Sequence, residues 1–128
     1  NLTTMRDNLN ELNLPVNDLK GATVKNLSGD RIGKINDLML DVDRGSIAYA
    51  VLEVDTGFLN LGSKYFAIPW QAFSFEKHYE NEITLDVDKQ KLEDSPGFDK
   101  EDWPTGPQYE FIDRVHTYYG INRDSNIL

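Results

Sequence analysis

The chain has 128 residues and a net charge of -9, from 22 acidic against 13 basic side chains, and it contains no cysteine. This length fits one domain with terminal extensions, and the acidic balance argues against direct binding to nucleic acid, because contact with a phosphate backbone requires clustered Lys and Arg. The lack of cysteine excludes disulfides, thiol catalysis and thiolate metal sites.

Hydropathy gives no sign of a membrane-spanning or secreted protein. No apolar run approaches the roughly 20 residues of a transmembrane helix, and no stretch has the order of a signal peptide. We therefore expect no transmembrane segment in this chain and a cytoplasmic location. The sequence begins at Asn1 without an initiator methionine, so we also allow for a targeting or anchoring segment removed from its N-terminus.

The first 15 residues are predicted to form a helical arm. Apolar residues recur there at spacings of three, four and three: Leu2, Met5, Leu9 and Leu12. This spacing is typical of a short amphipathic helix, which Pro15 would end. Because about a dozen helical residues are marginally stable alone in water, we expect the apolar face to dock on the domain or on a partner helix.

The middle of the chain, residues 28–54, reads as two strands joined by a turn of Asp, Arg, Gly and Ser. Both strands are rich in Ile, Val, Leu and Tyr, which together with the turn predicts a β-hairpin. In the first strand Ile35 falls on the opposite parity from Leu38. We therefore predict a β-bulge at Asn36 and Asp37, which would let the sheet curl.

The second strand of this hairpin, residues 47–54, is apolar at nearly every position. Both of its faces should be covered, one by the core and the other by a second layer or another subunit, so Tyr49 is a candidate for partner contact. The glycine-bounded loop that follows carries Phe58, Leu59 and Leu61. These side chains either plug one end of a barrel or form an apolar patch for a partner.

Further strands are predicted at residues 22–26, 64–70, 74–78 and 83–87, the last as a closing or edge strand. In all, about six short strands separated by tight turns predict an all-β fold, a small and strongly bent β-barrel over residues 16–90. Eight residues are expected in its core: Ile35, Leu38, Leu40, Val51, Phe66, Ile68, Ile83 and Leu85. If Leu40 is buried in this way, its replacement by alanine should cost about 2–5 kcal/mol.

The composition changes near residue 91, after which prolines interrupt regular structure. Residues 91–128 are therefore predicted to form an extended, acidic tail. The tail carries too many large apolar groups for a solvated segment. We expect its aromatic residues to anchor it on the outer face of strand 47–54, in the same chain or in a dimer mate: Phe98, Trp103, Tyr109 and Phe111.

Five stretches of the sequence, considered together and in order, are similar to those of a known family: residues 19–24, 29–37, 41–51, 57–70 and 85–88. Together they resemble the PRC-barrel domain family over residues 16–90, through their order and spacing rather than through any one piece. The tail also resembles the extension of stand-alone bacterial members. The resemblance implies a small bent β-barrel used as an adaptor, and it brings no catalytic motif to transfer.

One cluster of carboxylates is a weak metal candidate. Asp37, Asp41 and Asp43 lie close together in sequence, and the stretch from Asp41 resembles the opening of a calcium loop. Gly45 and Leu52 stand where such a loop needs oxygen ligands, however. Carboxylates on the wet face of a strand and in its turn are the preferred interpretation. We predict no metal, no cofactor and no catalytic residue.

Two functions remain open at this stage. We favour a non-enzymatic adaptor that associates with a protein partner, and with itself as a homo-oligomer, through seven candidate residues: Tyr49, Phe58, Leu59, Leu61, Trp103, Tyr109 and Phe111. The alternative is a small-ligand or cation-binding module that uses the barrel mouth or the aspartate cluster. The two histidines, His78 and His116, are interpreted as structural or exposed, because a lone histidine is more often so than a ligand.

Overall fold

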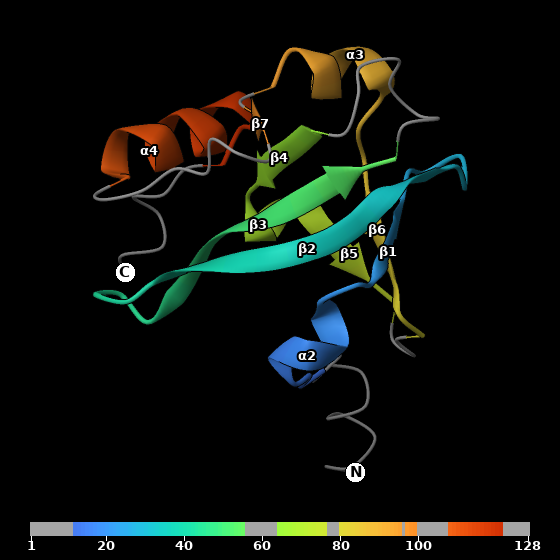
Figure 1. The fold of residues 1–128 in the computed structure, drawn as a ribbon, viewed down its shortest axis with the longest axis horizontal. Coiled ribbons are helices and arrows are strands. Elements are labelled where there is room, and N and C mark those ends of the chain that lie inside the picture. The colour runs from blue at the N-terminus through green and yellow to red at the C-terminus, as the bar shows by residue number, and fades with distance from the viewer. Residues whose placement is uncertain (1–11, 56–63, 77–79, 96, 100–107, 122–128) are drawn as a thin grey trace, which may run out of the picture.

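The computed structural model describes residues 12–55, 64–76, 80–95, 97–99 and 108–121 (Figure 1). The strands are β1 (Thr23–Lys25), β2 (Arg31–Asp41), β3 (Ser46–Val54), β4 (Lys64–Ile68), β5 (Phe73–Phe75), β6 (Glu82–Leu85) and β7 (Gly97–Asp99). The helices are α2 (Val16–Leu19), the 3-10 turn η1 (Trp70–Ala72), α3 (Lys89–Glu93) and α4 (Tyr109–Tyr118).

The strands form one curled sheet in the order β5-β6-β1-β2-β3-β4-β7. Neighbours pair antiparallel except β1 and β6, which are parallel. The six strands β1 to β6 confirm the predicted bent β-barrel fold, in the form of a half-barrel, and β7 from the tail extends it beyond β4. The prediction of β6 as an edge strand is wrong, because it lies between β5 and β1.

The long strand β2 changes register against β3 at two places. The shift between Ile35 and Asp37 confirms the predicted bulge. A second shift, between Met39 and Leu40, alters which face the following side chains occupy. Leu40 is consequently 60% exposed, so its predicted place in the core is wrong, and so is the cost of 2–5 kcal/mol expected for its truncation.

A glycine allows β2 and β3 to approach closely before the first bulge. A Cβ atom added to Gly33 would lie 2.1 Å from the backbone carbonyl oxygen of Glu53 on β3. Only glycine fits at this distance. The tight contact lets the two strands coil around the core.

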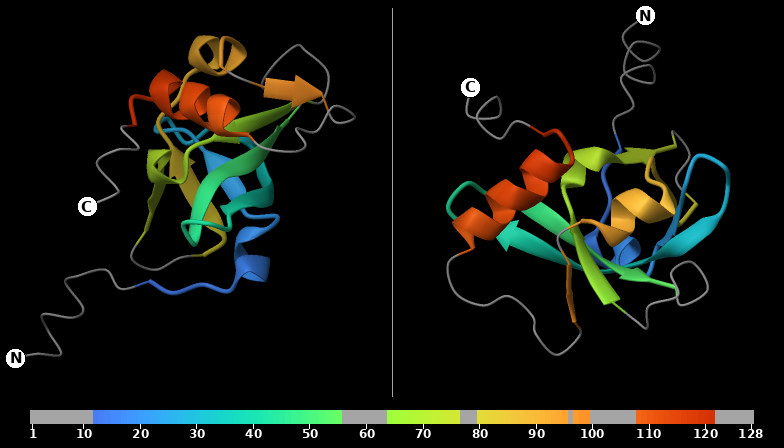
Figure 2. Two further views of the ribbon diagram at one scale, coloured as in Figure 1. Left: turned by 90° about the vertical axis from the view of Figure 1, so that its left-hand side faces the viewer. Right: turned by 90° about the horizontal axis from the view of Figure 1, so that it is seen from above.

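β3 is buried on both faces, as its sequence predicted. Its inner face, with Ala50 and Leu52, belongs to the main core inside the curl, and most of the other predicted core residues lie there too. Leu38 is only partly buried against this core. The outer face, with Tyr49 and Val51, belongs to a second cluster beneath α4. Leu19 of α2 and Leu92 of α3 belong to the main core inside the curl, whereas α4 lies on the outer face. Figure 1 and the left view of Figure 2 show α2 and α3 at opposite ends of the curled sheet.

The tail is not the extended segment that the prolines indicated, since the described part of it contains α3 and α4. α4 presents Ile112 and Val115 to the sheet, and both are buried. The helix ends before Gly120, whose φ of 73° is unfavourable for other residues, and the N–H of Ile121 donates to the carbonyl oxygen of His116 at 2.8 Å. Of the helical arm predicted over residues 1–15, residues 1–11 lie outside the described residues, and Leu12 to Pro15 are not helical.

Candidate functional site

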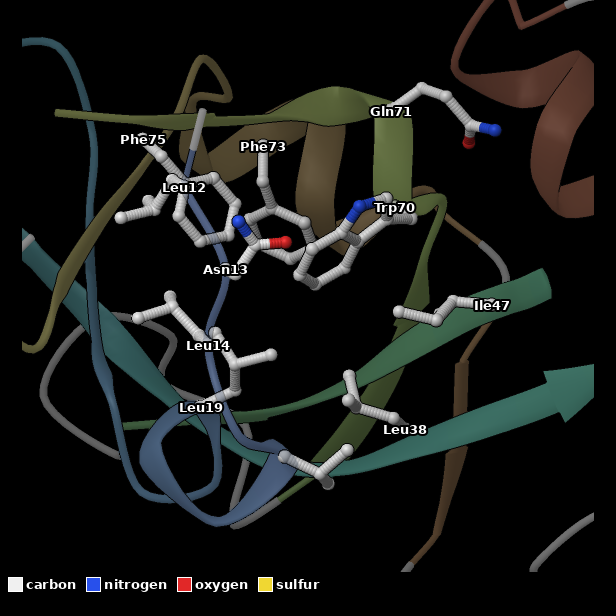
Figure 3. A pocket seen from close by; sticks show the side chains of 11 residues that line it. Leu12, Asn13, Leu14, Leu19, Leu38, Ile47, Trp70, Gln71, Phe73 and Phe75 are labelled. Atoms are coloured by element: carbon white, nitrogen blue, oxygen red, sulfur yellow. The ribbon is translucent and has the colours of Figure 1, made fainter. Parts of the chain in front are cut away.

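An apolar pocket of about 500 Å³ opens beside α2 (Figure 3). Val16 of α2 and Leu12 of the segment before it lie on one side of the pocket, and the sheet supplies Leu38 of β2 and Ile47 of β3. Leu12 is 38% and Val16 is 56% exposed, whereas Leu38 is half-buried. The pocket is therefore a place where apolar side chains reach the surface together.

Aromatic residues of η1 and β5 form the other side of the pocket. Pro69 precedes η1, and its carbonyl oxygen accepts a hydrogen bond of 3.0 Å from the N–H of Ala72, which reverses the chain between β4 and β5. Phe73 and Phe75, two residues apart on β5, share a face. Trp70 tilts against both, with ring centroids 6.1 Å from Phe73 and 5.2 Å from Phe75.

The pocket is continuous with the main core. Leu14, Leu38, Trp70 and Phe75 pack against the buried core while remaining partly exposed. Among the described residues that line the pocket, none is charged, and the polar side chains are those of Asn13 and Gln71. In a chain of net charge -9, such a surface is suited to apolar contact rather than to an ion or a charged substrate.

The outer face of the sheet, by contrast, is covered by the chain's own tail. The ring of Phe111 on α4 meets that of Tyr49 edge to face, with centroids 5.6 Å apart. The Tyr49 hydroxyl donates to Oε1 of Gln108 at 2.5 Å. Nε2 of His116 lies 2.8 Å from the Ala48 carbonyl oxygen, as a hydrogen bond from the imidazole to β3. These contacts fix α4 on β3.

Two tyrosines in this layer hold their protons tightly. Burial raises the pKa of Tyr49 to about 12 and that of Tyr119 to about 12. The cause is desolvation, because a buried phenolate would lose its hydration. Both groups therefore stay neutral well above neutral pH. Tyr49 contributes packing and a hydrogen bond, and Tyr119 contributes packing, rather than acid-base chemistry.

The structure separates the predicted partner-binding residues. Tyr49 has no exposed surface, so it is not available to a partner while α4 is in place. Phe111 is half-buried against it, and Tyr109 is 55% exposed, with its hydroxyl donating to Oδ2 of Asp43 at 3.2 Å. Tyr109 is thus not a buried anchor. The remaining candidates lie outside the described residues: Phe58, Leu59, Leu61 and Trp103, with the side chain of Phe98.

The three aspartates of the metal hypothesis do not converge. Asp37 accepts a hydrogen bond from the N–H of Leu38 at 2.8 Å, and Asp41 accepts one from the N–H of Arg44 at 3.2 Å. Asp43 is engaged by a tyrosine on α4. In the described part of the chain, no group of three or more His, Cys, Asp or Glu side chains could hold a metal ion. The described residues therefore give the aspartate cluster no support as a metal site, and the cation-binding alternative stays a prediction.

The comparisons with known proteins agree with this fold. The model of the PRC-barrel domain matches residues 13–92, well over half of the chain. The chain belongs to the PRC-barrel domain family, whose members generally serve as protein-interaction modules and are generally not catalytic. No curated protein matches it. None of the helices within the described ranges is long and apolar enough to cross a membrane.

The pocket was missed by sequence reasoning. Trp70 was predicted to end the strand at residues 64–70, and neither Phe73 nor Val16 was among the predicted site residues. The available signal was the density of aromatic residues after Pro69, three within six positions. That signal does not say which distant segment will lie opposite, so the pocket itself needs the three-dimensional arrangement.

Proposed function

We propose that this protein is a non-enzymatic adaptor that binds an apolar segment of a protein partner in the pocket beside Trp70. One observation carries the proposal: the main core extends to the surface there, through Leu38, Trp70 and Phe75, without a charged residue in the lining. The general role of the family supports a protein as the partner. Asn13, whose amide lies within the opening in Figure 3, can fix the orientation of a peptide by hydrogen bonds.

The shape of the pocket suits a helix better than an extended strand. Its lining comes from both sides of an opening rather than from one exposed sheet edge, and a groove with apolar walls accepts the apolar stripe of an amphipathic helix. Aromatic side chains such as those of Trp70 and Phe75 are the residues that most often dominate the energy of protein interfaces. We therefore expect Trp70 to be the main energetic contact.

A photo-cross-linking experiment tests this function. A benzophenone-bearing residue at Asn13, which is exposed and whose amide lies within the opening in Figure 3, is expected to form an adduct with one defined peptide of a partner when the protein is expressed in its own cells. The same group at Glu110, exposed on α4, is the control. If both positions label the same proteins, or if Asn13 labels none, the pocket is not a partner site.

A second candidate function, binding of a small apolar ligand, is favoured by the size of the pocket. Its volume of about 500 Å³ lies within the range of roughly 300–1,000 Å³ found for small-molecule sites. A ligand of this kind would raise the melting temperature of the purified protein by mass action. A screen of apolar compounds that leaves the melting temperature unchanged would dismiss it.

Self-association remains a prediction, and the structure supports it less than it supports partner binding. One of its three supports was the doubly apolar strand β3, and the outer face of this strand is covered within the same chain. The other two, the loop of residues 58–61 and the aromatic residues near Trp103, lie outside the described residues. Sedimentation at micromolar concentration decides, and a monomer would agree with the cover that α4 provides.

A further inference from the structure

The closed end of the β2–β3 hairpin forms a two-stranded arm. Within the described sheet, β1 pairs with β2 only as far as Lys34, and β4 pairs with β3 only from Ala50 to Glu53. Residues 39–41 of β2 and 46–49 of β3 therefore have only each other as strand partners. In Figure 1 this end of the hairpin extends beyond the neighbouring strands. We call residues 39–49 the hairpin arm.

The two faces of the hairpin arm are covered unequally. On the outer face, Met39 and Tyr49 pack in the cluster beneath α4. On the other face, Ile47 lines the pocket. Leu40 stands directly opposite Ile47 in the strand pairing, so these two side chains project from the same face of the arm. Leu40 therefore lies on the side of the arm that faces the pocket.

Leu40 continues the apolar surface of the pocket onto the arm. It follows Leu38, which lines the pocket, by two residues, a distance of about 7 Å along a strand. Leu40 is 60% exposed, and Val42 in the turn beyond it is 79% exposed. Neither belongs to a hydrophobic cluster in the described part of the chain. The pocket and Leu40 together form an apolar surface that is open to another molecule.

The exposed charges next to this surface are mainly acidic. Asp18 of α2, Glu76 directly after β5 and Asp43 in the turn of the arm are exposed carboxylates. The basic residues of the same segments are Lys20 and Arg44, and the Arg44 guanidinium already faces a carboxylate of its own turn at 3.9 Å. An apolar segment flanked by Lys or Arg complements these charges, whereas an acidic partner, such as a second copy with its net charge of -9, is repelled.

We propose that the pocket and Leu40 together bind a basic amphipathic helix of a protein partner. The inference rests on the proposed function, since it names the chemistry of the partner segment. The apolar stripe of the helix lies along the pocket and the arm, and its Lys and Arg side chains lie beside Asp18, Asp43 and Glu76. Anchors at positions i, i+4 and i+7 span about 10 Å along a helix, so one helix can contact both Leu38 and Leu40.

Two synthetic peptides test the charge of the partner. One is a helix of about five turns built from leucine and lysine, with its leucines in one stripe, and the other has glutamate in place of every lysine. Binding of each labelled peptide to the purified full-length chain is measured by fluorescence anisotropy at physiological salt. The lysine peptide is expected to bind at least about tenfold more tightly. Equal affinities would overturn the proposal.

A pair of leucine variants tests the arm. Leu40→Ser is expected to weaken binding of the lysine peptide by about fivefold to tenfold, because burial of an exposed leucine on binding is lost. Leu27→Ser is the matched control, since Leu27 is 71% exposed in the turn between β1 and β2, and it should leave the affinity unchanged. Thermal melts verify that both variants fold. Equal effects of the two substitutions would remove Leu40 from the binding surface.

A pair of charge variants tests whether the local carboxylates matter or only the net charge. Asp18→Asn combined with Glu76→Gln is expected to weaken the lysine peptide about threefold to tenfold at low salt and to reduce the salt dependence of its binding. Asp30→Asn combined with Glu93→Gln removes two exposed carboxylates elsewhere, in the β1–β2 turn and on α3, and should have a smaller effect. Equal losses would contradict local recognition.

Sedimentation of the parent chain and of Leu40→Ser tests a second copy as the occupant. A dimer that Leu40→Ser dissociates would overturn the proposal. The outcomes also separate this inference from the proposed function. If the peptide results hold while a benzophenone at Asn13 captures no partner in cells, the binding surface stands and the adaptor function fails. If Asn13 captures a partner segment without Lys and Arg, the adaptor function stands and this inference fails.

Discussion

Truncation of Ile112 on α4 measures how firmly the tail covers the outer face of the sheet. Ile112 is 6% exposed and packs in the cluster that contains Tyr49, Val51 and Val115. Replacing a buried isoleucine with alanine typically costs about 2–5 kcal/mol, through lost burial and a residual cavity. We expect Ile112→Ala to cost about 2–3 kcal/mol, because a single helix on the outside of a sheet can relax toward the cavity more easily than the interior of the half-barrel can.

The assay is urea unfolding of the purified chain, with the change in the free energy of unfolding taken from the shift in midpoint at constant slope. Thr117→Ala is the matched control, since Thr117 lies on the same helix and is exposed, and surface substitutions of this kind usually stay within about 0.5 kcal/mol. Equal effects of the two substitutions would show that α4 does not pack on β3 in solution. The outer face of β3 would then be free, and self-association would regain its support.

Three further predictions follow from the described packing. Leu40→Ala, at a position 60% exposed, should change stability by less than about 0.5 kcal/mol, whereas Leu52→Ala, fully buried on the paired strand, should cost about 2–5 kcal/mol in the same urea assay. Gly33→Ala should cost more than about 4 kcal/mol or abolish folding, because its Cβ would meet the Glu53 carbonyl at 2.1 Å; a thermal melt like that of the parent would contradict the close approach of β2 and β3. Burial raises the pKa of Tyr49 to about 12 from 10.0, so the stability that its neutral hydroxyl contributes is present below pH 10 and is lost between pH 10 and 12. At about 1.4 kcal/mol per pKa unit, the loss is up to about 3 kcal/mol. Alkaline melts of Tyr49→Phe should show a smaller loss of stability over that interval, and a loss equal to that of the parent would mean that another group titrates there.

Much of the sheet could be predicted from the sequence, because the physical signals there are local. The break in parity at Ile35 was sufficient to locate the first bulge, and the unbroken apolar run of β3 indicated two covered faces. The second register shift leaves no such break, since Leu38, Leu40 and Val42 continue to alternate in the sequence. The exposure of Leu40 therefore depends on the pairing with β3, which alternation alone does not report.

The helix in the tail could have been predicted from the sequence, but the prolines led to the prediction of an extended segment instead. Ile112, Val115 and Tyr119 recur at spacings of three and four, the stripe of a helix with one apolar face. Pro107 lies ahead of that stripe, where a proline is compatible with a helix that begins after it. The pocket, unlike this helix, could not be predicted from a local pattern. It joins a segment before β1 to aromatic residues after β4, and only the folded arrangement brings these together.

The two apolar surfaces of the half-barrel differ in how firmly the described part of the chain covers them. The outer face of β3 and β4 is closed by α4 through buried Ile112 and Val115 and through the hydrogen bond of Tyr49 to Gln108, and a partner could reach it only by removing a whole helix. Among the described residues, no comparable helix covers the pocket beside Trp70, and the side chains that line it remain partly exposed. A partner segment can bind at the lowest cost in free energy where the fewest existing contacts must first be broken. Partner binding is therefore expected at the pocket, while the layer of α4 on β3 belongs to the fold itself.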